Sequence, residues 1–279
     1  MALRLLIGFE GTEWDRQALA YVAPLAADPT VECTLLTIGR NPAGTAALLD
    51  EAREIVGGAP LRHIAASGSI YSAMLAEARA HPYDLVVFGQ VKGTWGRWTR
   101  LRQQRSLSAA LPTSSLLVRG EPVHTGHALI CTGGDETVIA DARLTGRLAR
   151  RIGARATILH VLSQVPLVFG RGVARDRITE AFAATGAPEM KHMQAAVAEL
   201  ATHGVDAAIK IRIGLVVEEI IAELSSGGYD LLVVGAHRSH GLVERLLLED
   251  VTADIVPESP VPVLVVKATG GGPPAAPRS

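Results

Sequence analysis

The sequence predicts an α/β fold built from two tandem open five-stranded parallel sheets, each with helices on both faces. Short runs of Val, Ile and Leu alternate with helical stretches of about a dozen residues, which is typical of βαβ units. The sequence Tyr-Asp-Leu-Val-Val-Phe-Gly at residues 83–89 returns as Tyr-Asp-Leu-Leu-Val-Val-Gly at 229–235. The run at 231–234 is apolar throughout, as in strands that are covered on both faces.

The repeat extends well beyond these seven residues. The apolar segment at 6–13 aligns with 129–136 at an offset of 123 residues, whereas Gly89 aligns with Gly235 at an offset of 146. The second copy therefore carries an insertion of 23 residues, the difference between the two offsets, which we place near 163–190. Self-similarity at so long a period indicates two copies of one structural unit.

Each copy opens with an apolar strand that runs into a turn and a helix, and each ends on a short apolar strand. In the first copy the pattern predicts strands at 3–9, 33–38, 61–66, 84–88 and 115–118, with helices at 13–27, 43–56, 69–80 and 101–110. In the second copy it predicts strands at 127–132, 155–161, 207–212, 230–234 and 262–266.

The boundaries of the domains follow from these elements. Residues 1–119 form the first domain and residues 127–267 the second, and the Gly- and Pro-containing segment 120–126 is the linker between them. The tail at 268–279 is rich in Gly, Pro and Ala, cannot bury apolar surface and is expected to be disordered.

Composition restricts the possible classes of function. A chain of 279 residues that is 48% hydrophobic can fill the cores of two domains. A net charge of −1 offers no reason to expect nucleic acid or an anionic membrane as a partner. No signal-peptide core and no run of 18 apolar residues is present, so we expect a cytoplasmic protein. Cys33 and Cys131 lie in predicted strands and are expected to be inert, buried thiols.

Several motifs together resemble the universal stress protein family. They are the strand ending in Glu-Gly-Thr at 10–12, Leu-His-Val at 159–161, Gly-Leu-Val-Glu-Arg-Leu-Leu-Leu at 241–248 and Ser-Pro-Val-Pro-Val-Leu-Val-Val at 259–266. The resemblance covers nearly the whole chain as a tandem of two domains. It implies an adenine nucleotide alpha hydrolase-like, Rossmann-like fold with, in the members that bind nucleotide, an ATP or AMP pocket at the carboxyl ends of the strands. Open α/β sheets bind ligands at that edge for physical reasons as well, since helix amino termini converge there.

The resemblance implies one candidate pocket in each copy. The residues of the first pocket are Glu10, Gly11, Thr12, Ile38, Gly68, Gly89, Lys92 and Arg102. Those of the second, weaker pocket are Thr132, Val161, Gly214, Gly235, Arg238 and Ser239. The candidate ligand is ATP or AMP with Mg²⁺, although no cofactor is required by the pattern.

The second copy departs from the family's phosphate-binding pattern, which is Gly, two residues, Gly, nine residues, then Gly with Ser or Thr. Arg238 stands at the second glycine, residues 249–250 are Glu-Asp where Gly-Ser would be, and Gly133 replaces the usual aspartate. A carboxylate at about 4 Å from a phosphate charge opposes binding by about 4 kcal/mol at an effective dielectric constant near 20. We therefore expect a degenerate site.

The first copy departs in a different way. It keeps an acid as Glu10, but Lys92 stands at the second glycine and residues 101–102 are Leu-Arg in place of Gly-Ser. The loop at 91–105 carries five basic residues, no acid, and two tryptophans. Such a loop is compatible with a phosphate or nucleotide, another small anion, a lipid-like molecule, single-stranded nucleic acid, an anionic membrane surface, or no ligand at all.

The remaining histidines and aspartates give only weak evidence of a metal or catalytic site. His237 and His240 lack a third ligand at metal spacing, so no metal site is expected, and no catalytic residue is assigned. His160 lies in an apolar strand and is interpreted as a core or pocket-lining residue. Asp84 and Asp230 occupy equivalent positions, which indicates a structural task such as capping a helix or fixing a turn.

The two copies are expected to pair with each other. Their last strands are short, apolar edge strands that need a partner, which predicts pseudo-twofold packing across them and leaves further homodimerisation open. Three interpretations of the insertion at 163–190 remain open: a lid over the second pocket, a helical hairpin used for interaction, or a mobile segment without a function. We therefore expect a non-enzymatic tandem universal stress protein, a cytoplasmic stress-response regulatory or interaction module with an unknown protein partner. The alternative is an ATP/AMP-binding module with slow ATP hydrolysis through the first pocket.

Overall fold

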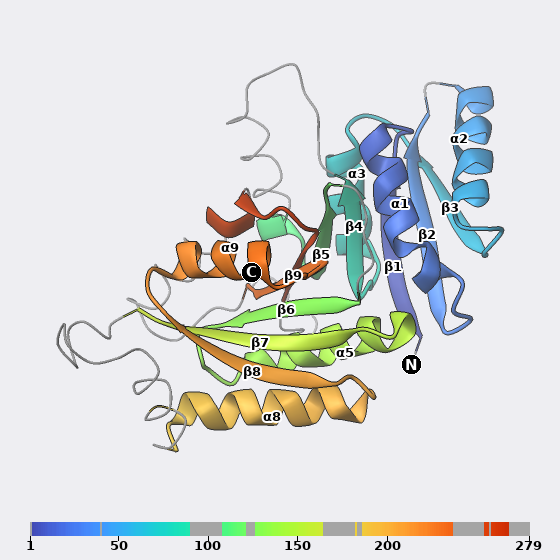
Figure 1. The fold of residues 1–279 in the computed structure, drawn as a ribbon. Coiled ribbons are helices and arrows are strands. Elements are labelled where there is room, and N and C mark those ends of the chain that lie inside the picture. Colours follow the sequence, from blue (N-terminus) through green and yellow to red (C-terminus); the bar gives the residue numbers. More distant parts are fainter. Residues whose placement is uncertain are drawn as a thin grey trace, which may run out of the picture.

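Ten strands form one continuous sheet in the computed structural model, which describes residues 2–39, 41–89, 108–120, 126–163, 182, 186–236, 254–256 and 258–267 (Figure 1). The strands are β1 (Leu3–Phe9), β2 (Val31–Ile38), β3 (Leu61–Ala66), β4 (Leu85–Gly89), β5 (Ser114–Val118), β6 (His127–Thr132), β7 (Arg155–Leu162), β8 (Ala207–Ile213), β9 (Leu231–Gly235) and β10 (Val263–Val266). All ten lie where the apolar runs predict them.

The sheet consists of two halves with the same internal order. The spatial order is β3-β2-β1-β4-β5-β10-β9-β6-β7-β8, and every pairing within each half is parallel. The halves meet where β5 pairs with β10 antiparallel, with Leu116 opposite Leu264. The expected two sheets are therefore one mixed sheet, because each last strand satisfies its unpaired backbone groups on the other.

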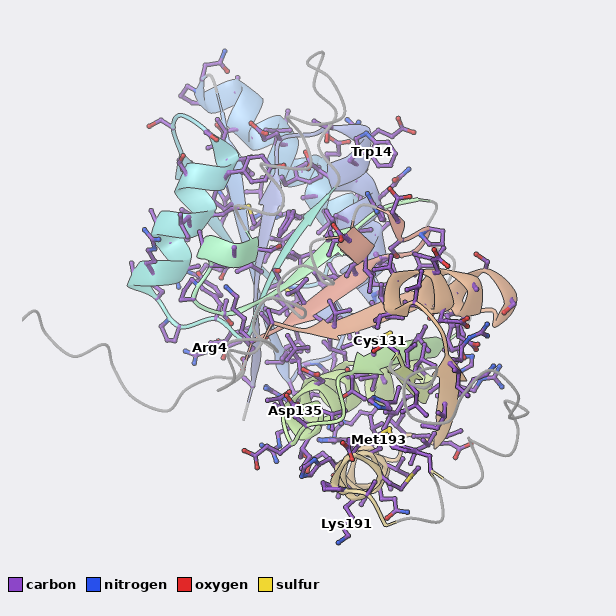
Figure 2. All side chains as sticks on the ribbon, turned by 90° about the vertical axis from the view of Figure 1, so that its left-hand side faces the viewer. Arg4, Trp14, Cys131, Asp135, Lys191 and Met193 are labelled. Atoms are coloured by element: carbon purple, nitrogen blue, oxygen red, sulfur yellow. The ribbon has the colours of Figure 1, made fainter. Side chains whose placement is uncertain are left out.

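Helices cover both faces of the sheet, and they are α1 (Glu13–Ala26), α2 (Pro42–Ile55), α3 (Ile70–Ala80), α5 (Val138–Ile152), α8 (Pro188–Thr202) and α9 (Val216–Ser226). One hydrophobic core joins α1, α2, α5 and α8 to one face, and a second joins α3 and α9 to the other (Figure 1). On α8, Met193 points toward the sheet and Lys191 away from it (Figure 2). Of the helix expected at 101–110, only 108–110 falls within the described residues, and it is helical.

The repeated Tyr-Asp pair has the same structural task in both halves. The Asp84 carboxylate accepts a hydrogen bond from the amide of Arg4 at 2.8 Å, and Asp230 accepts one from the amide of His127 at 3.1 Å. The hydroxyls of Tyr83 and Tyr229 each donate to a glutamate, Glu77 and Glu223 respectively, at 2.8 Å. Each aspartate thus fixes the start of the central strand beside it rather than the amino terminus of a helix.

The same two aspartates lie where the halves touch. Arg147 on α5 forms an ion pair with Asp84 at 3.0 Å, and the hydroxyl of Tyr21 on α1 donates to the carbonyl of Asp230 at 3.4 Å. Each half therefore sends a helix side chain to the Tyr-Asp segment of the other. No described helix is long and apolar enough to cross a membrane.

Candidate functional site

The described candidates of the first half converge on one edge of the sheet. Glu10 follows β1, Ile38 ends β2, Gly68 follows β3 and Gly89 ends β4, and these neighbouring strands are parallel. The carboxyl ends of parallel strands meet at the same edge, so the fold brings these positions together. Lys92 and Arg102 lie outside the described residues.

Backbone amides of the turn between β1 and α1 already donate hydrogen bonds to a side chain of α1. Asp15 accepts hydrogen bonds from the backbone N–H groups of Glu10 at 3.0 Å and Thr12 at 3.1 Å, while its own amide donates to the Thr12 hydroxyl at 3.2 Å. Gly11 between them has φ = +78°, a conformation that glycine adopts at little cost. Partial burial and the nearby Asp15 carboxylate raise the pKa of Glu10. The turn therefore presents negative charge, and two of the amides that could face an anion already have an acceptor.

Gly89 is required by packing. A Cβ atom at this position would lie 2.3 Å from the carbonyl oxygen of Trp14 and 3.0 Å from the amide nitrogen of Asp15. The end of β4 thus rests directly on the first turn of α1. This contact explains the glycine without reference to a ligand.

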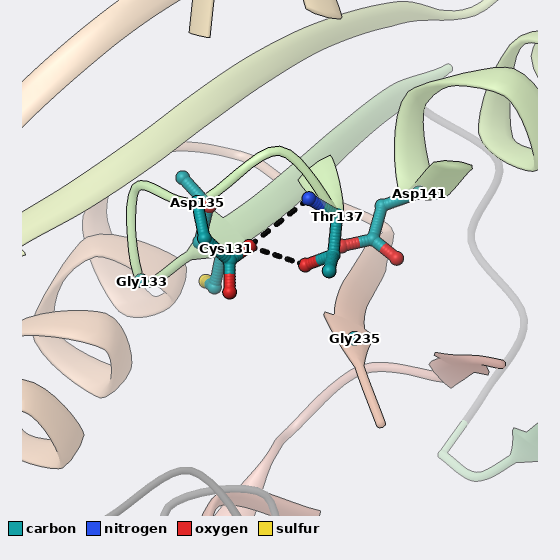
Figure 3. A pocket seen from close by; sticks show the side chains of 7 residues that line it. Cys131, Gly133, Asp135, Thr137, Asp141 and Gly235 are labelled. Carbon is teal, nitrogen blue, oxygen red and sulfur yellow. Dashed lines mark hydrogen bonds between the residues drawn. The ribbon is translucent and has the colours of Figure 1, made fainter. Parts of the chain in front are cut away.

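The described candidates of the second half share the equivalent edge. Thr132 ends β6, Val161 lies near the end of β7, Gly214 follows β8 and Gly235 ends β9. Thr132 and Gly235 border a small cavity of about 30 Å³, which Figure 3 shows from close by. Its lining residues are Cys131, Thr132, Gly133, Asp135, Thr137, Asp141 and Gly235. Arg238 and Ser239 lie outside the described residues.

This cavity is acidic. Asp135 accepts hydrogen bonds from the backbone amide of Thr137 at 3.1 Å and from the Thr137 hydroxyl. Asp141, in the first turn of α5, is only 2% exposed. Burial, together with the negative charges of Asp141 and Glu223, raises the pKa of the Cys131 thiol, which keeps it neutral and unreactive. An anion entering the cavity would meet two carboxylates.

Side chains from β7, from α8 and from the segment before α8 cover the turn after β6. His160 Nδ1 lies 3.0 Å from the carbonyl of Thr132, and His192 Nδ1 lies 2.9 Å from the carbonyl of Gly134. The ring of Phe182 stacks on His160 with centroids 5.7 Å apart. His160 is thus a satisfied, buried histidine, as its apolar strand predicts.

Sequence reasoning missed the two aspartates of the cavity. At the offset of 123 residues, Asp135 aligns with Thr12 and Asp141 with Ala18, so comparison of the copies offers no signal. The position of Asp141 in the first turn of α5 is the single feature that could have indicated it. His237, His240 and the basic loop at 91–105 lie outside the described residues, and the described part of the chain brings no three His, Cys, Asp or Glu side chains together around a metal-sized site.

An open, largely parallel α/β sheet with both candidate sites at the carboxyl ends of its strands defines a Rossmann-like protein. The model of the universal stress protein family matches residues 126–267, just over half of the chain, and the chain belongs to that family. No curated protein matches it significantly in sequence.

Solved structures share the whole fold at low identity. A universal stress protein from Archaeoglobus fulgidus DSM 4304 is 13% identical over 95% of this chain and 96% of its own, with a TM-score of 0.62. A functionally unknown protein from Pseudomonas aeruginosa PAO1 is 17% identical over 96% and 93%, with a TM-score of 0.63. A universal stress protein from Archaeoglobus fulgidus in complex with dAMP matches 52% of this chain and 99% of its own, at 16% identity and a TM-score of 0.37. The two matches that extend along the full length, at 13% and 17% identity, establish similarity of fold only.

Proposed function

We propose that this chain is a tandem universal stress protein in which residues 1–119 form a second domain of the family. It acts in the cytoplasm as a non-enzymatic regulatory or interaction module in the stress response, and its nucleotide sites are degenerate. The identical strand order of the two halves and the repeated Tyr–Glu and Asp–amide hydrogen bonds support the tandem arrangement. The antiparallel contact of β5 with β10 supports a pseudo-dimer formed within one chain.

The acidic cavity of the second half is the observation that carries the proposal of degenerate sites. Its volume of about 30 Å³ suits a water molecule rather than a nucleotide. Asp135 and Asp141 line it, and each carboxylate near a phosphate would oppose binding by several kcal/mol at the dielectric constant of a partly buried site. Together with Glu249 and Asp250 in the sequence, these negative charges support a pocket that no longer binds anionic ligands.

The first half supports the same conclusion by a different route. Asp15 already occupies the amides of Glu10 and Thr12, and Gly89 is explained by its contact with Trp14. One observation favours the alternative, an ATP/AMP-binding module with slow hydrolysis, because Glu10, Gly68 and Gly89 lie at one edge of the sheet and the basic loop at 91–105 follows Gly89 in the sequence.

Calorimetric titration of the full chain with ATP and with AMP, each with and without Mg²⁺, tests the proposal. We expect no heat of binding at millimolar ligand. Micromolar binding that an Arg102→Glu variant loses would place a live site in the first half and support the alternative. Micromolar binding that the variant retains would place it elsewhere, and either result would refute the degenerate sites.

A further inference from the structure

A groove separates α1 from α2 on the surface of the first half. Its volume is about 420 Å³, within the range of about 300–1,000 Å³ typical of ligand sites. Its lining residues are Glu13, Arg16, Gln17 and Ala20 of α1, at helical spacing on one face, and Glu51, Glu54 and Ile55 of α2.

The corresponding helices of the second half, α5 and α8, pack together more extensively than α1 and α2 do. Arg143 of α5 forms an ion pair with Glu199 of α8 at 2.8 Å. A Cβ atom at Gly146 would lie 2.5 Å from His203 Cδ2, so the glycine lets the two helices approach closely. Ala23 stands at the equivalent position of α1. The groove is therefore a departure of the first half from the packing of the second.

The charge of the groove is negative. Arg16 is paired with Glu51 across it, which neutralises that carboxylate. Glu13 and Glu54 form no ion pair with any residue that the structure describes. Glu54 lies in the last turn of α2, at the negative end of the helix dipole, where a carboxylate is unfavourable. A positive charge in the groove would pair with these carboxylates and would offset the unfavourable interaction of Glu54 with the helix dipole.

The groove also carries apolar surface. Ala20 and Ile55 add an apolar stripe to its lining.

We propose that this groove docks a segment of a partner protein that bears Lys or Arg side chains. Their cationic groups fit Glu13 and Glu54, and their aliphatic stems cover Ala20 and Ile55. The inference rests on the proposed role as an interaction module and names the chemistry of the partner. The groove also borders the β1–α1 turn, because a Cβ atom at Gly11 would lie 3.7 Å from Glu51 Oε2.

Fluorescence anisotropy with a labelled peptide of alternating Lys and Ala residues tests the proposal on the full chain at physiological salt. The double variant Glu13→Gln/Glu54→Gln should weaken binding about tenfold, the effect of losing two ion pairs of up to about 1 kcal/mol each. The matched control is Glu136→Gln/Glu218→Gln, which changes the net charge equally at exposed positions, Glu136 being the repeat equivalent of Glu13. The control should stay within about twofold of the native protein, and circular dichroism should show both variants folded.

Three results would overturn the proposal. Absence of peptide binding, or equal weakening in both double variants, would show that the groove has no special affinity for basic segments. Competition by spermidine at lower concentration than unlabelled peptide would identify a small polyamine as the occupant. A change in oligomeric state confined to Glu13→Gln/Glu54→Gln, measured by sedimentation, would identify a second copy of the chain. Nucleotide calorimetry is independent of all these outcomes, so failure of the docking proposal and failure of the degenerate sites remain distinguishable.

Discussion

Arg119 and Lys267 occupy equivalent positions, one residue beyond β5 and β10, and each side chain reaches carbonyl oxygens of the opposite half. Arg119 Nη1 donates to the carbonyls of Val256 and Ser259, the latter at 2.9 Å. Lys267 Nζ donates to the carbonyls of Ala109 at 2.9 Å and Leu111 at 2.6 Å. A reciprocal pair of cationic side chains therefore joins the halves on either side of the central antiparallel contact.

Replacement of Arg119 by Met should destabilise the protein. The side chain is 6% exposed, so its loss leaves buried carbonyls without a charged donor, at a cost of about 1–3 kcal/mol in the free energy of unfolding. Urea denaturation measures the change, and Arg53→Met, which removes only an exposed ion pair with Asp50, serves as the control with an effect near zero. Equal stability of Arg119→Met and the native protein would contradict the role of this contact.

Asp15→Ala should loosen the turn before α1. The variant removes the acceptor of the Glu10 and Thr12 amides and one side of the capping box of α1, which corresponds to about 0.5–2 kcal/mol of stability. Hydrogen exchange followed by NMR should show faster exchange at those two amides. Unchanged protection of both amides would mean that Asp15 does not hold them.

Gly89→Ala tests the contact between β4 and α1. The added methyl group would lie 2.3 Å from the carbonyl oxygen of Trp14, a backbone atom that cannot move alone, so we expect a loss of about 1–3 kcal/mol. Thermal unfolding provides the measurement. Gly44→Ala is the control, because its methyl group would meet only Asn41 Oδ1, at 3.2 Å. A Gly89→Ala variant as stable as the native protein would refute close packing there.

His127 should make stability depend on pH. Burial, and then the positive charge of Arg155, lower its pKa below the ordinary value of about 6.5, against smaller opposing contributions from Asp230 and Glu223. The unfolded chain therefore binds a proton more readily than the folded one, so this stabilisation is complete above about pH 6.5 and falls as the pH decreases below it. His127→Gln should reduce the slope of unfolding free energy against pH between about 7 and 5, by at most about 1.4 kcal/mol per pH unit. The control is His81→Gln, at an exposed side chain, and an unchanged slope in His127→Gln would contradict the assignment.

The strands could be predicted because they depend on local pattern. An apolar run such as 231–234 is a buried strand in either half, and the equivalence of Asp84 with Asp230 correctly indicated a shared structural task. The partner of each aspartate could not be predicted. The amides of Arg4 and His127 lie 80 and 103 residues away in sequence, and only the parallel register of the sheet brings them near.

By itself the sequence determined where the ten strands lie, that the segment at 83–89 returns at 229–235, and that residues 101–102 and 249–250 are Leu-Arg and Glu-Asp. Each of these properties is a matter of spacing along the chain. Only the tertiary structure decided that the two units share one sheet, that Asp15 occupies the amides of the first candidate site, and that Asp141 lines the second. These depend on contacts between atoms brought together by strand register and helix packing, and no periodicity of the sequence specifies which side chain fills a given space.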